Sequence, residues 1–168
     1  MTSWNDVVAA APDLAGRAQA IMASTTNCVL GTLRADGSPR LSGIDPFFLE
    51  GELYIGSMPR SRKGADMARD PRIALHAIPW ESRKVKEGAP DPGIGDAKVA
   101  GRAVRLEDPA EVRRIFEAYF ADLAYDTPDE GDLYRVDVES VVVVSVEDPE
   151  LVIDRWTASG GVQQVRRT

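Results

Sequence analysis

The chain has 168 residues, of which 43% are hydrophobic and 28% charged. This composition is ordinary for a water-soluble protein, and the length favours one domain with a substantial core. The net charge of −7 argues against nonspecific binding to nucleic acid or anionic lipid. A single cysteine, Cys28, and a single histidine, His76, exclude an intrachain disulfide and a Cys/His zinc cluster. With neither a membrane-length apolar run nor a leader pattern, we expect a cytoplasmic protein without a membrane or nucleic-acid partner.

The chain opens with a predicted helix over residues 3–23, which Ser3 caps and which carries Asp6 in its first turn. Further helices are predicted over 61–69 and from 109 to about 123, the latter capped by Asp108. Strands are predicted at 28–34, 39–49, 53–57, 72–78, 98–106, 133–138, 141–146 and 151–156, with 162–166 a candidate for one more. Residues 81–95 predict a long exposed loop.

Many short strands at hairpin spacing predict a mainly β fold, an antiparallel barrel that is closed or nearly closed. We expect one domain over 1–168, with the helix at 3–23, the barrel at 27–157 and a tail at 158–168. The run from Val141 to Val146 does not alternate between apolar and polar residues. Both faces of that strand should therefore be covered, and either a helix or a second subunit would provide the second cover.

The clearest chemical signal is a cluster of cations, Arg60, Arg62 and Lys63, around the start of the predicted 61–69 helix. A helix N-terminus already carries partial positive charge and unpaired N–H groups, so cations are unfavourable there in isolation. A bound phosphate would resolve the conflict, with Ser61 and the backbone N–H groups as donors. A solvated basic turn is the alternative.

Two neighbouring features fit a ligand at this place. Arg40 follows the hairpin turn at Asp36-Gly37. It would lie near the basic turn if the second and third strands pair through the turn at Glu50-Gly51. Gly56-Ser57 precedes the basic turn, and a glycine in a strand permits close approach of a flat ligand.

These segments resemble the pyridoxamine 5'-phosphate oxidase-like split barrels, which bind FMN or the deazaflavin F420. The similarity lies in the hairpin Leu30–Arg40, in Ser61-Arg62-Lys63 followed by Asp70-Pro71-Arg72, and in Val99–Ala103. It implies an antiparallel split β-barrel that forms a homodimer, with the cofactor site at the subunit interface.

The resemblance also implies particular cofactor contacts. Arg62 and Lys63 would bind the cofactor phosphate. The segment from Arg40 to about Asp45, including Leu41 and Ser42, would line the ring and ribityl chain, together with Gly56 and Ser57. Trp156 and Arg166 reproduce the spacing of a Trp and an Arg that reach the cofactor across the dimer interface.

Three positions depart from the family pattern. Asp96 stands where the oxidase has a glutamine that touches the flavin. Val162 and Gln164 stand where it has the Arg and His that grip its vitamin substrate. Neither can supply a charge or an imidazole, so we expect a protein other than a true pyridoxamine phosphate oxidase.

The function that follows is an oxidoreductase with FMN, or alternatively F420, which transfers a hydride to or from an unidentified small molecule. F420 also carries a phosphate, so the basic turn does not discriminate between the two cofactors. The alternative from another class is a non-catalytic protein that binds or stores flavin or haem. Haem is the less favoured ligand unless His76 faces a pocket as an axial ligand.

Overall fold

A computed structural model describes the chain except residues 26, 80–94, 122, 124–125, 129 and 148. The loop predicted over 81–95 therefore lies outside the described residues, apart from Gly95, which begins a strand. Four helices are described: α1 (Trp4–Ala10), α2 (Pro12–Ser24), α3 (Arg62–Arg69) and α4 (Pro109–Ala121). The strands are β1 (Cys28–Leu33), β2 (Pro39–Ile44), β3 (Pro46–Leu49), β4 (Glu52–Ser57), β5 (Arg72–Ala77), β6 (Gly95–Arg105), β7 (Asp132–Glu147), β8 (Glu150–Thr157) and β9 (Gly161–Arg167).

The single N-terminal helix predicted over 3–23 is wrong, because two helices occupy this segment. Ser3 caps α1 as predicted, in a capping box with Asp6. The break falls at Ala11, whose backbone is non-helical (φ −150°, ψ 64°). Pro12 follows at the first position of α2, where its missing N–H is harmless, whereas inside a continuous helix it would cost a hydrogen bond.

The strand predicted over 39–49 is also divided, and Asp45 lies between its two halves. β2 pairs with β1 around the turn at Asp36-Gly37. β3 pairs with β4 around the turn at Glu50-Gly51. Only β3 therefore forms the hairpin that was expected of the whole segment, because β2 pairs with β1 instead.

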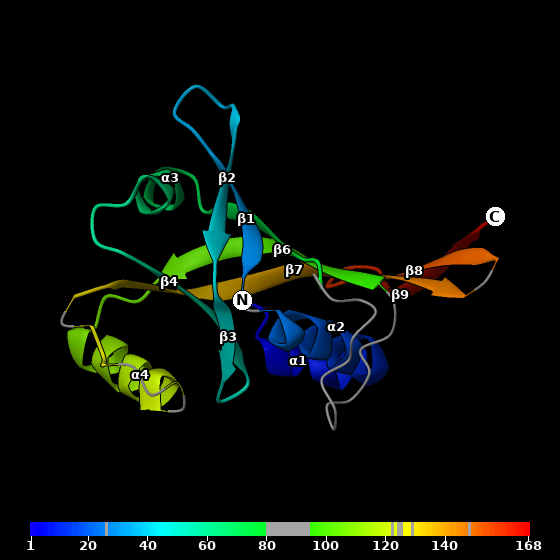
Figure 1. The fold of residues 1–168 in the computed structure, drawn as a ribbon, viewed down its shortest axis with the longest axis horizontal. Helices are drawn as coiled ribbons and strands as arrows, with labels where there is room; N and C mark the ends of the chain where they lie inside the picture. The colour runs from blue at the N-terminus through cyan, green and yellow to red at the C-terminus, as the bar shows by residue number, and fades with distance from the viewer. Residues whose placement is uncertain (26, 80–94, 122, 124–125, 129, 148) are drawn as a thin grey trace.

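The nine described strands join one antiparallel sheet, in the order β2-β1-β5-β6-β7-β4-β3, with β8 on β7 and β9 on β8 (Figure 1). The 16-residue strand β7 connects the two halves. Residues 132–135 of β7 pair with β4, residues 140–147 pair with β8, and β6 runs along the other edge. The mainly β, antiparallel prediction is confirmed, and 162–166 does belong to a last strand, β9.

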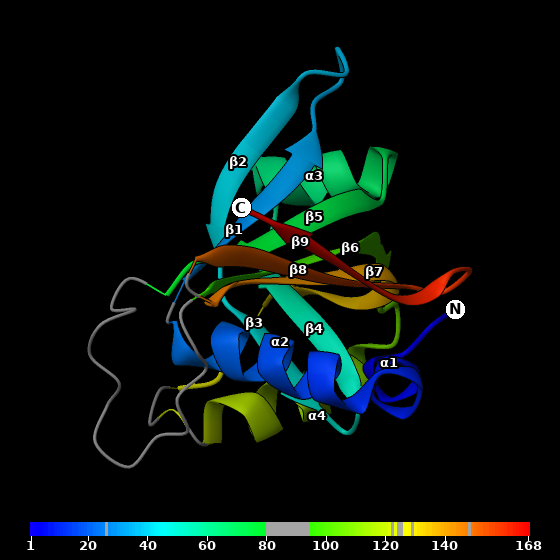
Figure 2. The same ribbon diagram turned by 90° about the vertical axis from the view of Figure 1, so that its right-hand side faces the viewer.

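Helices α1 and α2 lie beneath β7 and β8, whereas α3 lies beside β1, β2 and β5 (Figure 2). Val141 and Val143 of β7 are buried in the main core with Trp4, Ile21 and Trp156. The core beneath helices α1 and α2 thus covers one face of the valine run. No helix of the described chain combines the length and apolar character needed to cross a membrane.

The opposite face of the sheet is open. Val142 and Val144 alternate with the buried valines and are half-buried. Leu41, Val146 and Val165 on this same face are 74%, 54% and 48% exposed. The second cover that the valine run predicts is thus absent from the described part of this chain.

Candidate functional site

The start of helix α3 is a capped, unusually basic turn. The Ser61 hydroxyl accepts a hydrogen bond from the Gly64 N–H at 2.9 Å, and Ser61 Oγ lies 2.5 Å from Ser57 Oγ. Ser61 therefore caps the helix as predicted and also connects it to the end of β4. Arg60 reaches this cap through a left-handed backbone conformation (φ 58°), which is costly for a residue with a Cβ.

The cap leaves the first-turn N–H groups of Arg62 and Lys63 without an intrahelical acceptor. Their side chains differ in environment. The Lys63 ammonium donates to the main-chain oxygen of Gly43 at 2.9 Å, and burial lowers the pKa of Lys63, partly opposed by the negative charge of Asp45. Arg60 and Arg62 are exposed. Their guanidinium groups make no ion pair with another described residue, so both remain available to an anion.

Lys63 also lines a pocket of about 400 Å³, a volume suited to a small-molecule ligand. The pocket lies between the ends of β2 and β4, the start of α3 and helix α4. Its walls comprise Asn27, Gly43, Ile44, Asp45, Phe47, Gly56, Ser57, Met58, Lys63, Phe116, Tyr119, Phe120, Leu123, Pro128, Glu130 and Gly131. We call it the Lys63 pocket.

The Lys63 pocket combines aromatic walls with a few polar groups. The rings of Phe47 and Tyr119 stack at a centroid distance of 4.0 Å, nearly parallel at 14°. Burial raises the pKa of Asp45, with Lys63 opposing the shift, and burial likewise raises the pKa of Tyr119. An aromatic surface beside a partly buried ammonium suits a flat ring that carries an anionic group.

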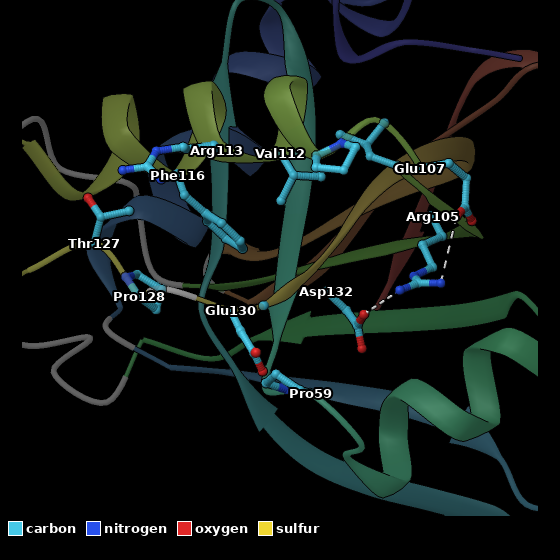
Figure 3. A pocket seen from close by; sticks show the side chains of 13 residues that line it. Pro59, Arg105, Glu107, Val112, Arg113, Phe116, Thr127, Pro128, Glu130 and Asp132 are labelled. Atoms are coloured by element: carbon cyan, nitrogen blue, oxygen red, sulfur yellow. Dashed lines mark hydrogen bonds and ion pairs between the residues drawn. The ribbon is translucent and has the colours of Figure 1, made fainter.

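A second pocket, of about 470 Å³, shares Phe116, Pro128, Glu130 and Gly131 with the first, and Figure 3 shows the side chains that line it. It is more polar. Arg105 and Asp132 form an ion pair across it, with 2.8 Å between Nη2 and Oδ1, and Glu107 and Glu130 lie on its rim. We call it the Arg105 pocket.

The structure brings together only part of the predicted site. Gly56, Ser57 and Lys63 line the Lys63 pocket, and Ser61 adjoins it through Ser57. Arg62 follows Ser61 at the surface.

The predicted residues of β2 point elsewhere. Arg40 turns beneath α3, where its Nε donates to Asp66 Oδ2 at 2.5 Å. Leu41 lies on the open sheet face and Ser42 is half-buried. None of these three lines the Lys63 pocket, whereas the next residues, from Gly43 to Asp45, do.

The C-terminal candidates lie far from the pocket within this chain. Figure 1 places the β8–β9 hairpin at the opposite end of the molecule from α3 and α4. Trp156 is 4% exposed and packs in the main core. Arg166 pairs with Glu147 and Glu150 at 2.9 and 2.8 Å. Their predicted contact with a cofactor held by another subunit remains a prediction.

His76 lies outside both pockets. Its Nε2 atom is 2.5 Å from Asp96 Oδ2, and the Lys98 ammonium donates to both oxygens of the same carboxylate. Hydrogen bonds from Lys98 and His76 lower the pKa of Asp96 against the opposing effect of burial. His76 therefore lines neither of these two pockets, and its ligation of haem remains a prediction.

Sequence reasoning missed the wall that α4 contributes. Phe116, Tyr119 and Phe120 project from one side of α4 into the Lys63 pocket. Their spacing at i, i+3 and i+4 is the signal of one helix face. It could have indicated an aromatic face, but gives no indication of whether that face meets the core or a ligand.

Solved structures share this fold at low sequence identity. One is PhzG from Burkholderia lata in complex with tetrahydrophenazine-1-carboxylic acid, with a TM-score of 0.62 and 14% identity over 86% of this chain and 83% of that one. ChuZ from Campylobacter jejuni has a TM-score of 0.67 and 16% identity, over 86% and 59%. A heme binding protein from Mycobacterium smegmatis has a TM-score of 0.59 and 21% identity, over 90% and 57%.

The match with this chain covers 57% of the length of the mycobacterial protein and 59% of the length of ChuZ. These likenesses establish the antiparallel split barrel and nothing about the ligand. No protein of curated function matches the chain. The family model for pyridoxamine 5'-phosphate oxidase matches residues 14–146, from the first residues of α2 nearly to the end of β7. With the fold and this match in agreement, the chain belongs to the pyridoxamine 5'-phosphate oxidase family.

Proposed function

We propose that the chain is an FMN-dependent oxidoreductase that holds the cofactor phosphate at the start of α3. The observation that carries the proposal is the capped turn. It offers two N–H groups without intrahelical acceptors, and exposed guanidinium groups on Arg60 and Arg62 beside the pocket that Lys63 lines. F420 is the alternative cofactor, since its phosphate would meet the same groups.

The residues present fit such a cofactor. Arg62 and Lys63 would pair with the phosphate, with the first-turn N–H groups as further donors. Gly56 and Ser57 would adjoin the ring end, since both line the Lys63 pocket. FMN supplies hydride transfer when it is bound. The chain contributes binding, orientation and an aromatic wall that excludes water from one side of the pocket.

A homodimer with the site near its interface is the second part of the proposal. The open sheet face carries exposed Leu41, Val146 and Val165 among the charged side chains of Asp96, Lys98 and Arg155. Exposed apolar side chains grouped within a polar surround mark protein contacts. Gly43 lies on that face and also lines the Lys63 pocket. A second copy on the open face would therefore reach the edge of the pocket.

The proposed substrate is a flat unsaturated small molecule, for which the walls of Phe47, Tyr119 and Phe120 provide a stacking surface. The neighbour PhzG carries a tricyclic carboxylic acid, which is a substance of this shape and charge. Asp45 and Tyr119 line the pocket and are candidates for a proton transfer. Ser57 lines it as well, whereas His76 does not.

The decisive experiment compares FMN with riboflavin, which differ only in the phosphate. We expect the full-length protein to bind FMN at least tenfold more tightly in calorimetric titration. The double variant Arg62→Gln/Lys63→Gln should remove that preference and leave riboflavin affinity unchanged. Arg72→Gln is the matched control, because it removes an exposed cation beyond the other end of α3.

Equal affinity of the wild type for FMN and riboflavin, or an unchanged preference in the double variant, would overturn the phosphate assignment. A parallel titration with F420 assigns the cofactor. A Soret band in the purified protein, with no flavin binding, would favour the haem-binding alternative.

A further inference from the structure

Met58 lies at the opening of the Lys63 pocket. It directly follows the last residue of β4 and is one of the residues that line this pocket. The Ser61 N–H donates to the Met58 main-chain oxygen at 3.2 Å, so the basic turn holds its backbone in place. Its side chain is nevertheless 79% exposed, the largest fraction among the large hydrophobic side chains that the structure describes. A side chain that lines a pocket and is this exposed borders the entrance.

The other three methionines have different surroundings. Met22 and Met67 are each 2% exposed and belong to the main core. Met1 is 70% exposed and lines neither pocket. Because an oxidant must reach the sulfur atom to convert methionine to its sulfoxide, the two core methionines should be protected. Met58 alone among the four combines exposure with a place in a ligand pocket.

Oxidation of Met58 would change the chemistry of the pocket opening. A thioether is apolar and polarisable and makes favourable contacts with aromatic rings, whereas its sulfoxide is polar. Gly56 and Ser57, which adjoin the ring end of the proposed ligand, directly precede Met58 in the lining. A bound ring would therefore cover the Met58 side chain, and burial of an unpaired sulfoxide oxygen is unfavourable. Oxidation and ligand binding thus oppose each other at this residue.

We propose that Met58 is an oxidation site that regulates the Lys63 pocket, whose thioether form retains a flat ring and whose sulfoxide form weakens its binding. The inference rests on the proposed function and adds a regulatory modification to it. The oxidant is hydrogen peroxide, which forms when O2 takes two electrons and two protons from a reduced flavin. One peroxide oxygen forms the S=O bond as the O–O bond breaks. The sulfur loses two electrons, and the other oxygen leaves as water with both protons.

The remaining sulfur atom of the chain belongs to Cys28, and its surroundings protect it. Cys28 is 2% exposed, and burial raises the pKa of its thiol to about 11. Because the thiolate is the form that reacts, Cys28 should be slow to oxidise at pH 7. A response of the pocket to peroxide is therefore expected to come from Met58.

The first measurement locates the oxidation. The full-length protein without added flavin is treated with hydrogen peroxide in the dark. Trypsin then separates the four methionines into the peptides 1–17, 18–34, 41–60 and 64–69. Mass spectrometry should show the sulfoxide forming at Met58 at least about tenfold faster than at Met22 or Met67. Saturation with riboflavin should slow the reaction at Met58 and leave that at Met1 unchanged.

The second measurement is the affinity for riboflavin and for FMN, by calorimetric titration after Met58 is oxidised and the peroxide removed. Both affinities should fall about fivefold, because each ring covers the same sulfoxide. Met58→Gln places a polar amide at the opening and should weaken both flavins without peroxide. Met58→Leu keeps an apolar side chain there and should not respond to peroxide. Met67→Leu is the matched control, since it removes a core thioether and should respond as the wild type does.

Equal oxidation rates at Met58 and at the core methionines would overturn the proposal, as would flavin affinities that do not change when Met58 is fully oxidised. A peroxide response that persists in Met58→Leu would overturn it too, because another atom would then be responsible. These failures are distinguishable from failure of the phosphate assignment. That assignment fails if untreated protein binds FMN and riboflavin equally, whereas the Met58 proposal predicts a parallel loss of both after oxidation.

Discussion

Arg40 and Asp66 form an ion pair beneath helix α3, with 2.5 Å between Arg40 Nε and Asp66 Oδ2. Thr32 donates to the same carboxylate at 3.0 Å and Arg69 at 3.1 Å. The side chain of Asp66 is 4% exposed, and its partners come from β1, β2 and α3 itself. Arg40 therefore helps to fasten α3 and the basic turn at its start to the sheet.

This ion pair predicts a particular loss of stability in acid. Hydrogen bonding, chiefly from Arg40, lowers the pKa of Asp66 to about 2. Since the folded value lies below the unfolded one, Asp66 stabilises the fold above about pH 4. That contribution is lost as the pH falls toward 2. Denaturant unfolding measured between pH 7 and 2 should show the decline.

Asp66→Asn should flatten that decline and should lower the free energy of unfolding at pH 7 by about 3 kcal/mol, because it leaves the largely buried Arg40 guanidinium without its counter-charge. Asp13→Asn is the control, since it changes an exposed carboxylate in the first turn of α2. Identical pH profiles for wild type and Asp66→Asn would contradict the assigned role.

The turn between β3 and β4 gives a second prediction. Glu50 and Gly51 both have positive φ, 51° and 78°. A Cβ on Gly51 would lie 2.0 Å from Asn5 Nδ2, and the Asn5 N–H donates to the Gly51 oxygen at 2.9 Å. We expect Gly51→Ala to reduce the free energy of unfolding by at least about 1 kcal/mol, from left-handed strain alone.

Glu50→Gly is the matched change at the neighbouring position. It relieves the left-handed strain and removes an exposed ion pair with Arg114, which is worth at most about 1 kcal/mol. Its net effect should therefore be small. Thermal unfolding of the two variants should separate them clearly, and equal melting temperatures would contradict the argument.

These elements also indicate how far sequence reasoning can go. Local signals were reliable where one residue decides the geometry: Ser3 and Ser61 at helix starts, and Asp36-Gly37 at a hairpin. Pro12 carried the same kind of signal, and the prediction overlooked it. The division at Asp45 was not predictable, because β2 and β3 are separated by their pairing with different partners.

The candidate site divides in the same way. The basic turn at Ser61–Lys63 depends on neighbours in sequence, so its composition alone identified it. Arg40 was assigned by its position along a presumed hairpin, but long-range pairing directs it to Asp66. The aromatic wall from α4 arises only when a helix some 60 residues later packs over β3 and Tyr54 of β4, and no local pattern shows that contact.

The open sheet face leads to a prediction about assembly. We expect light scattering to show a dimer, and Leu41→Glu to shift it toward monomer, because a charge would then be buried in the interface. FMN affinity should fall in the same variant. Val8→Glu is the control, since Val8 is exposed on α1, which packs on the other face. A wild type that is monomeric at low micromolar concentration would overturn the dimer.

The last prediction concerns Gln164, which stands where the resemblance predicts a substrate-gripping histidine. Its Nε2 atom donates to Asp154 Oδ1 at 2.8 Å, and Arg17 of α2 pairs with the other oxygen of that carboxylate. Gln164 thus fastens β9 to β8. We expect that the FMN-loaded protein does not oxidise pyridoxamine 5'-phosphate. The measurement is the absorbance of the pyridoxal product, which should not increase.

Gln164→His should not create that activity, because Val162 still stands at the place of the second substrate-binding residue. Gln164→Leu should lower the free energy of unfolding by about 1–2 kcal/mol, since it leaves the largely buried Asp154 carboxylate short of one donor. Hydrogen exchange should then rise first in β9, whose side chains are exposed throughout. Turnover by the wild type would show that other residues bind the vitamin substrate. The chain would then catalyse the oxidation of pyridoxamine 5'-phosphate, the reaction that names its family.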